Sequence, residues 1–87
     1  MARIFSIEFT FTGAIYHAMI TVRETSFHKE YKISLQSNEL APLLLSDKIV
    51  SPEPGVFIFA NVSQQQYNEL MKQILAAVAN HIHSLQH

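Results

Sequence analysis

The chain has 87 residues, a formal net charge of −1 and 48% hydrophobic residues. This length predicts a single domain, residues 1–87, because two cores would each be too small to fold without metals or disulfides. The chain contains no cysteine, which excludes disulfides, thiol catalysis and thiolate metal sites. A domain this small buries only about 60–65% of its unfolded surface, so the hydrophobic content favours burial of further surface in an oligomer.

Charge and apolar pattern also limit the expected partners and location. The basic residues are scattered along the sequence, whereas phosphate binding relies on several Lys and Arg gathered on one face, so nucleic acid is not an expected partner. Ser6 and Glu8 interrupt the apolar residues of the N-terminal stretch, so neither a signal peptide nor a membrane span is expected there. The expected location is the cytoplasm, without a membrane partner.

Residues 3–12 alternate strictly between apolar and polar side chains, which predicts a strand with one buried face. The apolar set of this strand is Phe5, Ile7, Phe9 and Phe11. A row of Phe on a sheet could also stack on RNA bases, but such platforms carry basic rims and glycines that this stretch lacks. The Phe row is therefore interpreted as core.

Gly13-Ala14 predicts a two-residue type II′ turn, because glycine enters positive φ without steric cost. A second strand, residues 15–24, follows, and the turn pairs Phe11 with Tyr16. The Phe row and the apolar set Tyr16, Ala18, Ile20 and Val22 of the second strand then fall on the same face, which a slip of one residue would destroy.

A third strand is predicted for residues 29–36. A four-residue connection pairs Val22 with Tyr31 on the apolar face and Arg23 with Glu30 on the opposite face. An opposite-charge pair across two strands is stabilising, so two separate features favour a three-stranded meander.

The stretch from residue 37 to residue 55 carries the weakest pattern. It favours a single helical turn with Pro42 near its start, and a short edge segment over residues 43–45 is the alternative. Pro and Gly then interrupt the chain before a fourth strand predicted for residues 56–60, whose position in the sheet stays open.

A long C-terminal helix is predicted for residues 64–85. Ser63 and Gln66 have the spacing of a capping box. Apolar residues then recur with a helical period: Tyr67, Leu70, Met71, Ile74, Leu75, Val78, Ile82 and Leu85. The helix stripe and the Phe row are expected to cover each other.

Histidines at the end of this helix raise the question of a metal site. His83 and His87 have the four-residue spacing of two ligands on one helix face, whereas His81 lies at the edge of the apolar stripe. Structural metal sites normally use three or four protein ligands, and no third is near in sequence. The favoured interpretation is a helix terminus where imidazoles complement the dipole.

Glu8 and His17 are predicted to lie near each other on the polar face, His17 opposite Thr10 and Glu8 diagonal to it. A carboxylate beside an imidazole is a possible acid–base pair. The sequence supplies neither a cleft nor a nucleophile nor an oxyanion site beside them, so an ordinary polar face is favoured. We therefore expect no catalytic residue, no cofactor and no enzyme activity.

More apolar side chains are present than one sheet–helix interface needs. The sheet face away from the Phe row carries Ile4, Ile15 and Met19, and the fourth strand must add either Phe57 with Phe59 or Val56 with Ile58. Ala76 and Ala79 lie on the outer side of the helix, where small residues allow close approach of another element, although helix propensity alone also explains alanine. The predicted interface candidates are Ile4, Ile15, Met19, Phe57, Phe59, Ala76 and Ala79.

The stretch FTFTGAIYHAMITVRE, with a third strand and a capped helix after it, resembles small bacterial domains of ββββα type. The resemblance implies a bacterial, cytosolic origin and assigns no site residue. The predicted fold is α+β, a four-stranded, mainly antiparallel meander with one long C-terminal helix on one face. The expected function is a non-enzymatic protein-interaction module that forms a homodimer or binds another protein. The alternative is a small-ligand-binding domain that uses the open sheet face or a loop groove.

Overall fold

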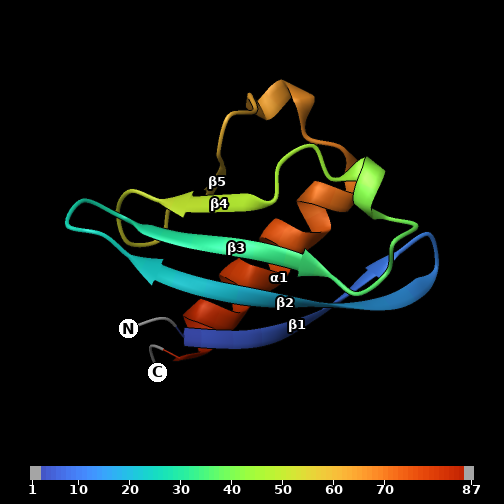
Figure 1. The fold of residues 1–87 in the computed structure, drawn as a ribbon, viewed down its shortest axis with the longest axis horizontal. Coiled ribbons are helices and arrows are strands. Elements are labelled where there is room, and N and C mark those ends of the chain that lie inside the picture. The colour runs from blue at the N-terminus through green and yellow to red at the C-terminus, as the bar shows by residue number, and fades with distance from the viewer. Residues whose placement is uncertain (1–2, 86–87) are drawn as a thin grey trace.

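The computed structural model describes residues 3–85 and shows an antiparallel sheet covered on one face by a helix (Figure 1). The sheet has the order β1-β2-β3-β4-β5, so each strand pairs with the next one along the chain. The elements are β1 (Arg3–Phe11), β2 (Ala14–Glu24), β3 (Lys29–Leu35), η1 (Ala41–Leu43), β4 (Lys48–Ser51), β5 (Ile58–Phe59), η2 (Gln64–Gln66) and α1 (Glu69–Leu85). The predicted α+β meander with a C-terminal helix is confirmed.

The sheet has five strands, so the predicted number of four is wrong. The additional strand is β4, which pairs with β3 through Tyr31 opposite Ile49. The strand predicted for residues 56–60 is only the two-residue β5, which pairs with β4 through Ile49 opposite Phe59. The predicted helical turn near Pro42 is confirmed, since η1 spans Ala41–Leu43 with the proline in its first turn.

The turn between β1 and β2 is formed by Thr12 and Gly13, and not by Gly13 and Ala14. Both residues have positive φ, 52° and 80°, as a type I′ turn requires. Phe11 therefore lies opposite Ala14, and Phe9 opposite Tyr16, which moves the register by two residues from the predicted one. A shift of two residues keeps every side chain on its predicted face, because side chains alternate with a period of two.

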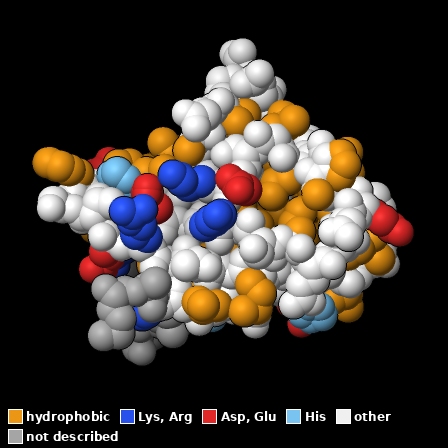
Figure 2. All heavy atoms as spheres, viewed as in Figure 1, with side chains coloured by type: hydrophobic (Ala, Val, Ile, Leu, Met, Phe, Trp, Pro, Cys, Tyr) orange, Lys and Arg blue, Asp and Glu red, His pale blue; other side chains and the backbone are white. Residues whose placement is uncertain are grey.

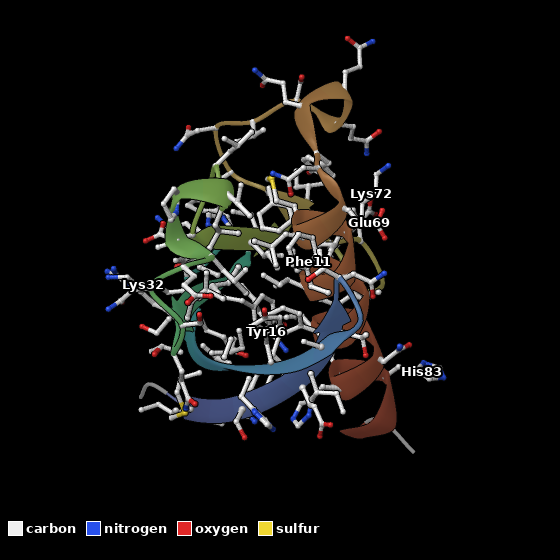
Figure 3. The ribbon with its side chains drawn as sticks, turned by 90° about the vertical axis from the view of Figure 1, so that its right-hand side faces the viewer. Phe11, Tyr16, Lys32, Glu69, Lys72 and His83 are labelled. Carbon is white, nitrogen blue, oxygen red and sulfur yellow. The ribbon has the colours of Figure 1, made fainter. Side chains whose placement is uncertain are left out.

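The predicted register between β2 and β3 is confirmed. Val22 lies opposite Tyr31, and Arg23 lies opposite Glu30. The core side chains of three strands thus share the face that α1 covers. Figure 3 shows Phe11 and Tyr16 between the sheet and the helix, while Lys32 points away from the far side of the sheet.

The α-helix begins at Glu69, five residues later than predicted. Gln66 Oε1 does accept a hydrogen bond from the Ser63 backbone N–H at 3.1 Å, but this contact closes only the short turn η2. Tyr67 is extended, with ψ of 123°, and ends that turn. Asn68 caps α1, because its Oδ1 accepts a hydrogen bond from the Met71 N–H at 2.9 Å.

The core lies between the inner face of the sheet and one stripe of α1. The helix crosses the sheet diagonally, and its last turns lie against β1 (Figure 1). His81 closes this end of the core, since its ring stacks on Phe5 at a centroid distance of 4.0 Å. The buried apolar residues are Ile7, Phe9, Ala18, Ile20, Val22, Tyr31, Ile33, Leu40, Ile49, Phe59, Leu70, Met71, Ile74 and Val78.

Candidate functional site

The sheet face opposite α1, the outer face, carries exposed apolar side chains where the sequence predicts them. Ile4 on β1 is 63% exposed and Ile15 on β2 is 62% exposed, while Met19 is 37% exposed. These side chains expose apolar surface to water, and exposed apolar patches are typical of interaction sites. The part of the outer face formed by β1 and β2 is therefore suited to a partner. The role of these side chains in an interface stays a prediction.

Of the two sets that β5 and its preceding loop could direct outward, Val56 and Ile58 are the exposed one. Phe59 is 2% exposed and lies in the core, where its backbone N–H donates to Tyr67 Oη at 2.7 Å. Phe57 is partly buried against the core. Phe59 is therefore not available as an interface residue in this structure.

The two alanines proposed for the helix surface have different exposure. Ala76 is exposed, whereas Ala79 is only partly exposed. Ala79 lies beside a shallow hollow that also contacts Gly55 and Phe57. The side of α1 that faces β1 presents Ala77 and Asn80 next to Ser6 and Glu8, so the helix and the edge strand form one continuous surface.

Strand β1 is the longer of the two edges of the sheet. It has nine residues, whereas the opposite edge β5 has two. β1 pairs with β2 without interruption from Arg3 to Phe11 and contains neither proline nor lysine. In a hairpin with a two-residue turn, the residues beside the turn form a hydrogen-bonded pair, so the N–H and C=O groups of the even-numbered residues of β1 point outward. Within residues 3–85, no strand pairs with this edge.

Glu8 and His17 lie directly opposite each other, and not diagonally as the predicted register had it. Their closest nitrogen and oxygen atoms, His17 Nε2 and Glu8 Oε2, are 3.9 Å apart. The two side chains are 55% and 61% exposed on the open outer face. An exposed pair of this kind contributes little to stability and offers no enclosed position for a substrate.

The helical histidines do not converge. His81 stacks on Phe5 inside the fold, whereas His83 points from the far side of α1 (Figure 3). His87 lies outside the described residues, so the predicted His83–His87 pair stays a prediction. Among residues 3–85, no group of three or more His, Asp or Glu side chains is placed to hold a metal ion.

Basic residues that are distant in sequence meet on the outer face. Lys32 on β3 lies opposite Lys48 on β4, and Arg23 lies on the neighbouring strand β2, opposite Glu30. Figure 2 shows Lys and Arg side chains gathered on this face. Glu30 is the carboxylate beside them, with Lys48 Nζ at 3.5 Å from its Oε1. The sequence prediction treated these cations as scattered, although the alternation of the strands already directs them to one face.

Compared with protein-family models, with curated proteins and with solved structures, the chain matches none. The resemblance to small bacterial ββββα domains therefore stays an expectation from the sequence pattern, as do the bacterial origin and the cytoplasmic location. The described part of the chain has no helix that is long and apolar enough to cross a membrane.

Proposed function

We propose that the protein is a non-enzymatic interaction module that forms a homodimer through the edge strand β1. The observation that carries this proposal is the nine-residue edge, which ends the sheet without an irregularity. Soluble proteins usually protect such an edge with proline, lysine, a bulge or a covering segment, because its free N–H and C=O groups can pair with another strand. β1 has only Arg3 and Glu8 as charged residues.

The sequence of β1 is suited to pairing with itself. In an antiparallel pair centred on Ile7, Ile4 lies opposite Thr10 of the partner subunit, and Ser6 lies opposite Glu8 of the partner subunit. The outward-pointing backbone groups then form the new hydrogen bonds, and no like charges face each other. A pair centred on Glu8 would set two carboxylates opposite each other, which disfavours that register.

This pairing makes one two-fold interface that extends both layers of the fold. The two sheets become a single ten-stranded sheet, since each subunit contributes five strands. The helices follow on the same side, where Ala77 and Asn80 lie beside the β1 edge. Ile4 and Met19 then lie near the new junction on the outer face, which gives these exposed residues a role in self-association.

Charge substitutions at Ser6 test both the edge and its register. Ser6→Glu places a carboxylate opposite Glu8 of the partner subunit, and the two-fold axis repeats this like-charge pair. Ser6→Lys makes two opposite-charge pairs at the same positions. We expect the first variant to raise the dimer dissociation constant and the second to lower it, each by about 2- to 30-fold. Light scattering over a concentration series, with sedimentation equilibrium for the constants, measures both effects.

Ser34 is the matched control, because it is exposed on the same face but belongs to β3 inside the sheet. Ser34→Glu and Ser34→Lys should leave the dissociation constant unchanged. A monomer at every attainable concentration would overturn the proposed self-association. A dimer that responds to the Ser34 variants and not to the Ser6 variants would overturn the assignment to β1.

A further inference from the structure

A hollow opens between the last turns of α1 and the sheet, at the end where β1 begins. Its volume is about 430 Å³, within the range of small-molecule sites. An adjoining hollow of about 330 Å³ extends it toward the β2–β3 connection and shares Lys29, Tyr31 and Ile82 with it. We name the two together the Tyr31 hollow.

Tyr31 is the polar group at the centre of this hollow. The residue is only 2% exposed and lines the hollow. A tyrosine hydroxyl at the wall of a hollow can donate a hydrogen bond to a bound acceptor. Burial raises the pKa of Tyr31, while the nearby Arg3 lowers it and Glu24 raises it. The hydroxyl is therefore a neutral donor that lies within range of both charges.

The charges at the rim favour an anion. Arg3 and Lys29 share one carboxylate, because Glu24 Oε1 lies 4.0 Å from the Arg3 guanidinium and 3.4 Å from Lys29 Nζ. The part of the hollow beside β1 is lined by both cations and by no carboxylate, so this part carries the positive charge. The carboxylates Glu24 and Glu53 line only the adjoining part.

The remaining walls are apolar. Phe5 and Val22 come from the sheet, and Ile82 comes from α1. These three side chains pack against or belong to the core, so they are held in place. We propose that the Tyr31 hollow binds a small organic acid, with the carboxylate at Arg3, Lys29 and the Tyr31 hydroxyl and an apolar body against Phe5, Val22 and Ile82. This proposal does not rest on the β1 dimer, and either can fail alone.

Hexanoate is a suitable probe, because it combines a carboxylate with a short apolar chain. In a ¹H–¹⁵N NMR titration of the full chain, we expect saturable shifts at the amides of Val22, Lys29 and Tyr31. Hexan-1-ol lacks the charge and acetate lacks the apolar chain, so each should bind at least about tenfold more weakly. Inorganic phosphate should also bind more weakly, which distinguishes an organic acid from a free anion.

Two substitutions locate the site. Tyr31→Phe should raise the dissociation constant for hexanoate about 2- to 10-fold. It should leave the thermal midpoint nearly unchanged, because the ring that fills the core is retained. Arg3→Gln should weaken binding about tenfold or more, since it removes a charged hydrogen-bond donor from the rim.

Lys72→Gln is the control, because Lys72 lies on the exposed side of α1, away from the sheet (Figure 3). It should leave the affinity for hexanoate unchanged. The proposal is overturned if hexanoate causes no saturable shift, or if hexan-1-ol binds as tightly. Equal weakening by Lys72→Gln and Arg3→Gln would also overturn it, since attraction would then be non-specific.

Discussion

Replacing Asn68 with alanine should destabilise the protein more than any other polar substitution near the start of α1. Asn68 makes two contacts with different segments. Its Oδ1 accepts from the Met71 N–H at 2.9 Å, and its Nδ2 donates to the Leu43 carbonyl at 2.6 Å. One side chain thus caps the helix and fixes the η1 turn to it.

The cost follows from these two contacts. Loss of an N-cap costs about 1 kcal/mol, and loss of one further hydrogen bond costs about 0.5–1 kcal/mol when it is accessible to water. We therefore expect Asn68→Ala to lower the free energy of unfolding by about 1.5–2 kcal/mol. For a domain of this size, this corresponds to a fall of about 6–16 °C in Tm.

Two further variants separate the contributions. Asn68→Asp keeps the oxygen that caps α1 but loses the donor to Leu43, so its cost should stay below about 1 kcal/mol. Ser63→Ala removes a hydroxyl that makes no contact with α1, and its cost should stay within about 0.5 kcal/mol.

Urea unfolding followed by circular dichroism, with the slope m compared between variants, measures these differences. If Ser63→Ala costs more than Asn68→Ala, the helix is capped at Ser63 and our reasoning about its start is refuted.

Two other predictions concern a turn and a pH range. Thr12→Asn should raise the free energy of unfolding by about 0.5–1 kcal/mol, because Thr12 has φ of 52° and asparagine tolerates this region better than a β-branched residue; a lower Tm for the variant would contradict the turn. Tyr31 has a pKa raised above 10.0 by burial, so the unfolded state loses this proton first and stability should fall as pH rises through that value. Across that pH range the urea midpoint should fall less for Tyr31→Phe than for the parent protein, while phenolate absorbance follows the ionisation of tyrosine. An equal fall of the midpoint in both proteins would show that Tyr31 is not the cause.

Alternation of side chains identifies β1, β2 and β3 from the sequence, because half-buried strands in a meander need only local information. It could not settle the register of the first hairpin. Two registers that differ by two residues bury the same faces, so hydrophobic pattern does not separate them. The positive φ angles of Thr12 and Gly13 decide between them, and the sequence prediction assigned these to the wrong pair.

Tertiary contacts determine three features that local sequence motifs do not predict: the start of α1, the strand β4 and the Tyr31 hollow. Ser63 and Gln66 satisfy the spacing of a capping box, yet Tyr67 is held outside the helix by its contacts with Phe59: the two rings meet edge to face at 5.1 Å, and the Tyr67 hydroxyl accepts from the Phe59 N–H. β4 is too short for its own periodicity to be recognised. The Tyr31 hollow combines residues of β1, β2, β3 and α1, so no local sequence motif predicts it.

The packing of β1 against α1, which are the first and the last elements of the chain, constrains the order in which the fold can assemble. During synthesis, β1, β2 and β3 can form their hairpins while α1 is still to be made, and their apolar face then has no cover. Contacts between such distant segments also slow folding, because a long loop must close before they form. The nascent meander, with its apolar face uncovered, is therefore the stage of synthesis at which aggregation competes most with folding.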